Sequence, residues 1–105
     1  MKIPMAMTIA MLAGGFGTAA QAAGNIQAGK AKSAACTACH GKQGISSNPD
    51  YPNIAGQTAP YLAKSLREFR SGLRKDPSTD MNRIAAGLSD ADIADLSAYY
   101  ASLRR

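Results

Sequence analysis

Both cysteines and the single histidine of this 105-residue chain lie within five residues of one another, in the sequence Cys36-Thr37-Ala38-Cys39-His40. These residue types form disulfides and bind metals, so the chain has to fold around whatever group they hold. Three uses fit such a cluster: a redox-active disulfide, part of a zinc site, or the covalent attachment of a haem.

The surroundings of the motif favour one of these uses. A thioredoxin-like pair starts a helix that follows a β-strand, because the helix dipole lowers the pKa of the nucleophilic thiol, whereas this pair ends a predicted helix. A structural zinc site needs four ligands, and the chain has no fourth cysteine or histidine. Cys-x-x-Cys-His is the attachment sequence of c-type haem. The motif therefore favours covalent haem, with the redox pair and the zinc site as weaker alternatives.

The first 22 residues have the organisation of a secretory signal peptide. Lys2 gives a positive start, residues 3–13 are mostly apolar, and Ala20-Gln21-Ala22 matches the small-x-small pattern at a cleavage site. The apolar run is about half the roughly 20 residues that span a membrane, which predicts cleavage rather than an anchor. We therefore expect residues 1–22 to be removed and residues 23–105 to form one exported, periplasmic domain without a membrane span.

A domain of this size and charge has two consequences. So short a chain buries only about 60% of its unfolded surface and usually needs a disulfide, a metal or a cofactor to stabilise it. The formal net charge is +5, one less after removal of Lys2. This charge favours acidic partners, but it is too small to indicate nucleic-acid binding.

The composition predicts an all-α fold of about four short helices. Valine is absent and alanine is abundant, which favours helix over strand. We expect helices over residues 25–38 and 59–71, a short helical stretch ended by Gly87, and a last helix that starts with the capping box Ser89-x-x-Asp92. Apolar side chains recur at helical spacing, at Leu62, Leu66, Phe69 and Leu73 and at Ile93, Leu96, Tyr100 and Leu103.

Met81 is the only methionine outside the predicted signal peptide. A methionine most often fills a gap in an apolar core. Met81 instead lies in the polar sequence Ser78-Thr79-Asp80-Met81-Asn82-Arg83, in a predicted loop between helices. A core residue would be out of place there, so we expect Met81 to be the second axial ligand of the haem iron.

The sequence resembles class I cytochrome c, and more narrowly one half of the dihaem cytochrome c4 group and its single-haem relatives. The resemblance covers nearly all of residues 23–105 and is carried by the motif above and by the strings Pro52-Asn53-Ile54-Ala55-Gly56-Gln57, Tyr61-Leu62, Phe69-Arg70-x-Gly72-x-Arg74 and Met81-x-x-Ile84-Ala85-x-x-Leu88-Ser89. A cytochrome c4 has two Cys-x-x-Cys-His motifs, whereas this chain has one.

The resemblance implies roles for several residues. Cys36 and Cys39 would form the thioethers of one haem c, His40 and Met81 would bind its iron, and the Pro52 carbonyl would accept a hydrogen bond from the His40 ring. Further residues would line the haem pocket or bind its propionates: Ile54, Leu62, Leu66 and Leu88 for the pocket, and Gln57, Tyr61, Arg70 and Arg74 for the propionates. Gly29 would allow the first and last helices to approach closely.

The function expected from this reading is transfer of one electron between respiratory redox partners in the periplasm. Because the protein fills both axial positions, substrate cannot reach the iron and no enzymatic activity is expected. The alternative is a haem-bearing subunit bound to a periplasmic dehydrogenase. The expected partners are redox proteins with acidic docking surfaces, such as a membrane cytochrome complex or a terminal oxidase or reductase. Two basic groups either steer these partners or form a solvated surface that keeps the protein soluble: Lys30, Lys32 and Lys42, and Lys64, Arg67, Arg70, Arg74 and Lys75.

Overall fold

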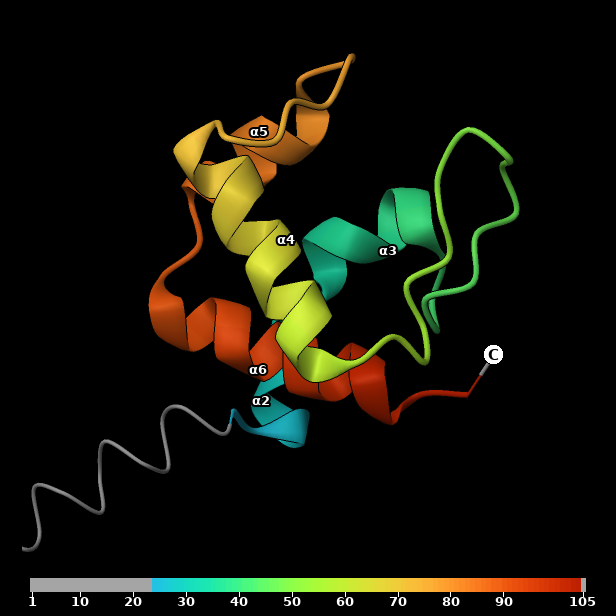
Figure 1. Cartoon of the computed structure of the whole chain (residues 1–105). Helices are drawn as coiled ribbons and strands as arrows, with labels where there is room; N and C mark the ends of the chain where they lie inside the picture. The colour runs from blue at the N-terminus through green and yellow to red at the C-terminus, as the bar shows by residue number, and fades with distance from the viewer. Residues whose placement is uncertain (1–23, 105) are drawn as a thin grey trace, which may run out of the picture.

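The computed structural model describes residues 24–104, so the predicted signal peptide lies outside the described residues. Within the described range the chain has only helices and loops, and no strand. The all-α prediction is confirmed, and residues 24–104 form five helices in place of the expected four or so (Figure 1): α2 Ile26–Lys32, α3 Ala34–His40, α4 Ala59–Ser71, α5 Asp80–Ala86 and α6 Asp90–Ser102. Among residues 24–104, none of the helices has the length and apolar character needed to cross a membrane.

The predicted single helix over residues 25–38 is wrong, because the chain forms two helices that meet at Ser33. The Ser33 hydroxyl donates to the Lys30 carbonyl at 2.8 Å, and the Ser33 backbone N–H also points to that carbonyl, at 3.3 Å. A serine side chain that bonds to the preceding turn competes with the regular helical pattern. Because of this break, α3 runs in a different direction from α2. Helix α3 contains the whole Cys-x-x-Cys-His motif and ends at His40.

Helix α2 is held tightly against α6, as Figure 1 shows. A Cβ atom added to Gly29 would lie 2.7 Å from the Tyr99 Cβ and would overlap the Asp95 carbonyl, so only glycine fits at this crossing. Lys32 forms ion pairs with Asp92 at 3.0 Å and Asp95 at 2.7 Å. The expected close approach of the first and last helices at Gly29 is confirmed.

A Gly29→Ala substitution tests this crossing. Alanine favours a helix by about 1 kcal/mol over glycine, but overpacking against backbone atoms costs roughly 1–3 kcal/mol or more, so we expect a net loss of stability. Guanidinium denaturation of the haem-loaded protein measures it. Gly87→Ala is the matched control, since its added Cβ would meet only the Ile84 carbonyl at 3.6 Å. A Gly29→Ala protein as stable as the control would contradict the packing described here.

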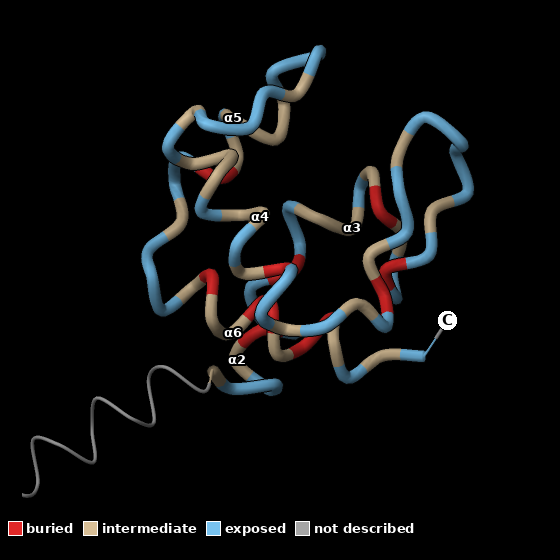
Figure 2. The backbone as a smooth tube through the Cα atoms, viewed as in Figure 1, coloured by how far each residue is buried: buried red, intermediate tan, exposed pale blue. Residues whose placement is uncertain are grey.

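The buried apolar cluster is small and centred on α6. Leu62 of α4 packs with Leu96, Tyr99 and Tyr100, and Figure 2 shows buried positions, in red, along α6. Helix α6 begins with the predicted capping box, in which Ser89 and Asp92 each accept the other's backbone N–H. Leu73 does not join the predicted stripe of α4: it is 79% exposed, because Gly72 ends the helix with a left-handed φ of 83°.

The segment from residue 41 to 57 folds back against α6. The Gly44 carbonyl accepts the backbone N–H groups of Ile54 and Ala55 at 2.8 and 3.0 Å, and the Gly56 N–H donates to the Tyr100 carbonyl at 3.0 Å. Gly44 has a φ of 74°, a conformation that other residues rarely adopt. These bonds close the loop and bring Pro52 beside the end of α3.

Candidate functional site

A cavity of about 630 Å³ lies between α3, the following loop, α4, α5 and α6. Side chains from all five segments line it, and most of its wall is apolar. The lining includes twelve of the thirteen residues that the sequence analysis assigned to a haem site, all but Arg70. Nine of the twelve are Cys36, Cys39, His40, Pro52, Ile54, Gln57, Tyr61, Arg74 and Met81. The other three predicted pocket residues, Leu62, Leu66 and Leu88, line it too.

His40 is the last residue of α3 and is only 8% exposed. Its Nδ1 lies 2.8 Å from the Pro52 carbonyl oxygen. Because a carbonyl can only accept, Nδ1 carries the proton of this hydrogen bond, which leaves Nε2 as the nitrogen that can bind a metal. A hydrogen bond from Nδ1 to a backbone carbonyl fixes the orientation of the ring and makes Nε2 a better metal ligand.

The two cysteines lie one turn apart on α3 as free thiols, both partly buried. Burial raises the pKa of the Cys36 thiol, which is the opposite of the shift that activates a redox pair. Within residues 24–104 no group of three or more histidine, cysteine or acidic side chains is placed to hold a metal ion. The arrangement therefore disfavours both alternatives to haem.

Met81 lies in the first turn of α5 and not in a loop as predicted. Its backbone N–H donates to Asp76 Oδ2 at 3.0 Å, and the Asp76 N–H donates to Asn82 Oδ1 at 2.9 Å. Asn82 Nδ2 in turn donates to the Phe69 and Arg74 carbonyls at 3.0 and 2.8 Å. This network ties the segment before α5 to the end of α4.

Sequence reasoning missed Asp76 and Asn82. The sequence Asp76-Pro77-Ser78 contains the one signal that was available, because an aspartate often accepts backbone N–H groups from the residues that follow it in a turn. The same turn holds Thr79 at a left-handed φ of 64°. The backbone at Met81 is thus positioned by the polar side chains of Asp76 and Asn82.

An Asn82→Ala substitution is expected to loosen Met81. It removes hydrogen bonds to three backbone groups, each worth roughly 0.5–1.5 kcal/mol, so exogenous ligands should displace a bound Met81 about tenfold or more readily. Cyanide titration of the oxidised protein measures this affinity. Asn48→Ala is the control, because it removes a hydrogen bond from the Asp50 N–H in the loop of residues 41–57. Equal cyanide affinity in the two variants would contradict a positioning role for Asn82.

Arg70 and Arg74 have separate positions. Arg74 lines the cavity; its guanidinium lies 4.7 Å from the centre of the Phe69 ring and donates to Ser65 Oγ at 3.1 Å. Arg70 is not brought to the cavity, because its guanidinium pairs with Asp90 at 2.8 Å and donates to the Leu88 carbonyl at 3.3 Å. Arg70 therefore joins α4 to the start of α6.

Tyr61 lies beside Arg74 at the rim of the cavity and is half exposed. Hydrogen bonding to Ser65, and then to Arg74, lowers the pKa of the Tyr61 hydroxyl. The pair thus offers a hydroxyl and a positive charge at one side of the opening, which suits a carboxylate.

Two buried hydroxyls have no hydrogen-bond partner in the described residues, those of Ser97 and Tyr100, and both line the cavity. Burial raises the pKa of the Tyr100 hydroxyl. Unpaired buried polar groups are costly, so their place on this wall indicates a cavity shaped for a bound group. Two thiols, a neutral imidazole, a thioether and apolar walls together fit a covalently attached haem.

Comparison with known proteins agrees with this geometry. The family model described as Cytochrome c matches residues 26–104, and the chain belongs to this family. It is 48% identical to cytochrome c-554(548) of Halomonas halodenitrificans over 81 residues, which are 76% of this chain and 98% of that protein. It is 39% identical to the thiosulfate dehydrogenase electron acceptor of Stutzerimonas stutzeri over 69 residues, 65% of this chain and 32% of that protein.

The fold is similar to that of reduced recombinant cytochrome c4 from Pseudomonas stutzeri, with a TM-score of 0.72 and 37% identity. The match covers 78% of this chain and 47% of that one, so the chain spans about half the length of this relative. With its single Cys-x-x-Cys-His motif, the chain is a single-haem electron carrier of the cytochrome c family that binds haem c covalently. The expected resemblance to one half of cytochrome c4 is confirmed.

Proposed function

We propose that this protein carries single electrons between respiratory redox partners in the periplasm, with His40 and Met81 as the axial ligands of its haem iron. The observation that carries this proposal is that His40, Met81 and the two cysteines all line one mostly apolar cavity. The bound haem supplies one-electron exchange between ferric and ferrous iron. The residues of the chain set how readily that exchange occurs.

Each residue in the cavity contributes to this task. Cys36 and Cys39 hold the group as thioethers, and the Pro52 carbonyl keeps the His40 ring oriented through the 2.8 Å contact. A thioether ligand favours ferrous iron, and apolar walls such as Ile54 disfavour the extra charge of ferric iron, so the reduction potential should be positive. Gln57, Tyr61 and Arg74, which line the cavity, would bind the propionates.

A free carrier is favoured over a permanently bound dehydrogenase subunit. A fixed subunit needs a large apolar interface, whereas a carrier needs a small and partly polar one. The large apolar side chains exposed in the described residues come from separate segments of the chain: Ile26, Ile45, Tyr61 and Leu73. A relative named as an electron acceptor of a dehydrogenase supports an enzyme of that kind as one exchange partner.

A potentiometric titration with carbon monoxide as the second ligand tests the proposed ligation. We expect a reversible one-electron transition at a positive potential and no binding of carbon monoxide to the reduced protein, because Met81 occupies the sixth position. A reduced protein that binds carbon monoxide readily would contradict the carrier and favour a ligand-binding function.

Export is tested separately by mass spectrometry of the protein recovered from the periplasmic fraction. The proposal requires the mass of residues 23–105 plus one haem. A protein that retains residues 1–22 and sediments with the membrane would overturn the assignment of a cleaved signal peptide.

A further inference from the structure

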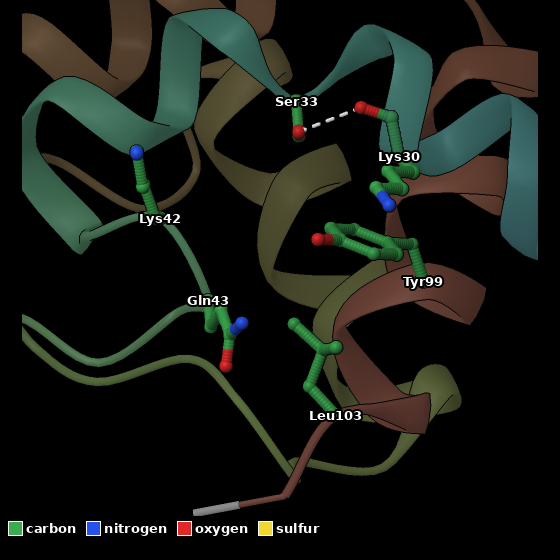
Figure 3. A pocket seen from close by; sticks show the side chains of 6 residues that line it. All are labelled: Lys30, Ser33, Lys42, Gln43, Tyr99 and Leu103. Carbon is green, nitrogen blue, oxygen red and sulfur yellow. Dashed lines mark hydrogen bonds between the residues drawn. The ribbon is translucent and has the colours of Figure 1, made fainter.

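A second cavity, of about 410 Å³, lies outside the haem site. It is bounded by the break between α2 and α3, by the turn that follows His40, and by the end of α6 (Figure 3). Six side chains line it: Lys30, Ser33, Lys42, Gln43, Tyr99 and Leu103. No acidic residue of the described chain is among them, so this pocket is positively charged.

The Ser33 hydroxyl donates to the Lys30 carbonyl, as Figure 3 shows, but the other polar side chains of this pocket have no partners among the described residues. Lys32 and Lys64 are paired with carboxylates, whereas neither Lys30 nor Lys42 forms an ion pair with residues 24–104. The Gln43 amide and the Tyr99 hydroxyl likewise form no hydrogen bond in this range. Two lysines, a glutamine and a tyrosine thus line one pocket, and together they carry the kinds of donor that a carboxylate requires.

The wall of the pocket is partly apolar. Figure 3 shows the Tyr99 ring reaching from α6 toward the segment that carries Lys42 and Gln43, with Leu103 beside it. An apolar wall suits the methylene groups of an aspartate or glutamate side chain, whereas a bare inorganic ion has nothing to place against it. The pocket therefore fits an acidic side chain better than a free inorganic anion.

The pocket lies next to the haem cavity. The Tyr99 and Tyr100 rings are 5.0 Å apart, Tyr99 lines the second pocket, and Tyr100 lines the haem cavity. Lys42 and Gln43 follow closely after His40 in the chain. A protein that places an acidic side chain here would dock beside the haem.

We propose that this pocket is a binding site for a carboxylate of an aspartate or glutamate on the redox partner. The proposal rests on the function proposed above for its biological role, but the binding itself can be measured without a partner. Of the three lysines in the first basic group, only Lys30 and Lys42 are available to a partner. Lys32 is already paired with Asp92 and Asp95.

The test is a titration of the reduced, haem-loaded, 15N-labelled protein with N-acetylglutamate N-methylamide, followed by NMR. We expect saturable shifts of the backbone amides of Gln43, Tyr99 and Leu103. The K30Q/K42Q variant should lose at least tenfold in affinity, while K64Q/R67Q, which also loses two positive charges, should match the parent. Unchanged visible spectra establish that both variants keep their haem site.

Three results would overturn the proposal. They are the absence of saturable shifts in the parent, equal loss of affinity in the two double variants, and binding of inorganic phosphate as tight as that of the glutamate probe. The last would show a general anion site without selection for an acidic side chain. None of these results changes the reduction potential or the carbon monoxide test, so failure here is distinct from failure of the carrier function.

Discussion

A chain with Cys36→Ala and Cys39→Ala is expected to be exported but to remain unfolded, without covalent haem, and to be degraded. The reason is the size of the space that the haem fills. Without the haem, a hollow of about 630 Å³ with mostly apolar walls would be left open to water, and the apolar area that the haem covers would not be buried. A small domain has a total stability of only about 5–15 kcal/mol, so the protein cannot remain folded around an empty site.

The measurement is the amount and colour of the protein in the periplasmic fraction after extraction with acid acetone, which removes haem that is not covalently bound. Thr37→Ala is the control on the same helix, because Thr37 is only partly buried and its hydroxyl donates only to the Ala34 carbonyl. This variant should keep its haem. A stable, folded and haem-free double variant would falsify the view that haem completes the core.

Met81→Ala is expected to open the sixth coordination position of the iron. The variant should bind carbon monoxide when reduced and cyanide when oxidised, and its reduction potential should fall substantially, because the thioether that favours ferrous iron is gone. Ligand titrations and potentiometry measure both effects.

Met81→His separates the two effects of this side chain. It should restore six-coordination and exclude carbon monoxide, yet keep a lowered potential, since imidazole favours ferric iron more than a thioether does. If the potential and the ligand affinities of Met81→Ala equal those of the parent, the sixth ligand is a different residue.

The local features of the fold could be predicted from the sequence because their causes are local. Thr58 caps α4, Gly72 ends it with a left-handed φ, and Ser89 with Asp92 forms the capping box of α6. The other residues of the haem cavity were predicted from the resemblance to cytochrome c. Neither spacing nor periodicity alone distinguishes a haem contact from an ordinary core position.

Features that depend on tertiary contacts could not be predicted. Arg70 lies in the last turn of α4 and Arg74 lies just beyond the end of the helix, and the position of α6 decides that Arg70 meets Asp90 while Arg74 stays at the cavity. Leu73 matches the apolar stripe in sequence, but it lies beyond the end of the helix. The break at Ser33 depends on whether its hydroxyl bonds to solvent or to the Lys30 carbonyl, and helix propensity does not decide this.

The central claim is that one covalent haem is bound to Cys36 and Cys39 and ligated by His40 and Met81. One set of optical spectra of the purified protein, oxidised, reduced and in alkaline pyridine, tests it most directly. The account predicts one haem c per chain, with both vinyl groups consumed, and the weak red absorption of a sulfur ligand on ferric iron in the oxidised spectrum. A pyridine spectrum of haem with intact vinyl groups, or an oxidised spectrum without the sulfur band, would contradict it.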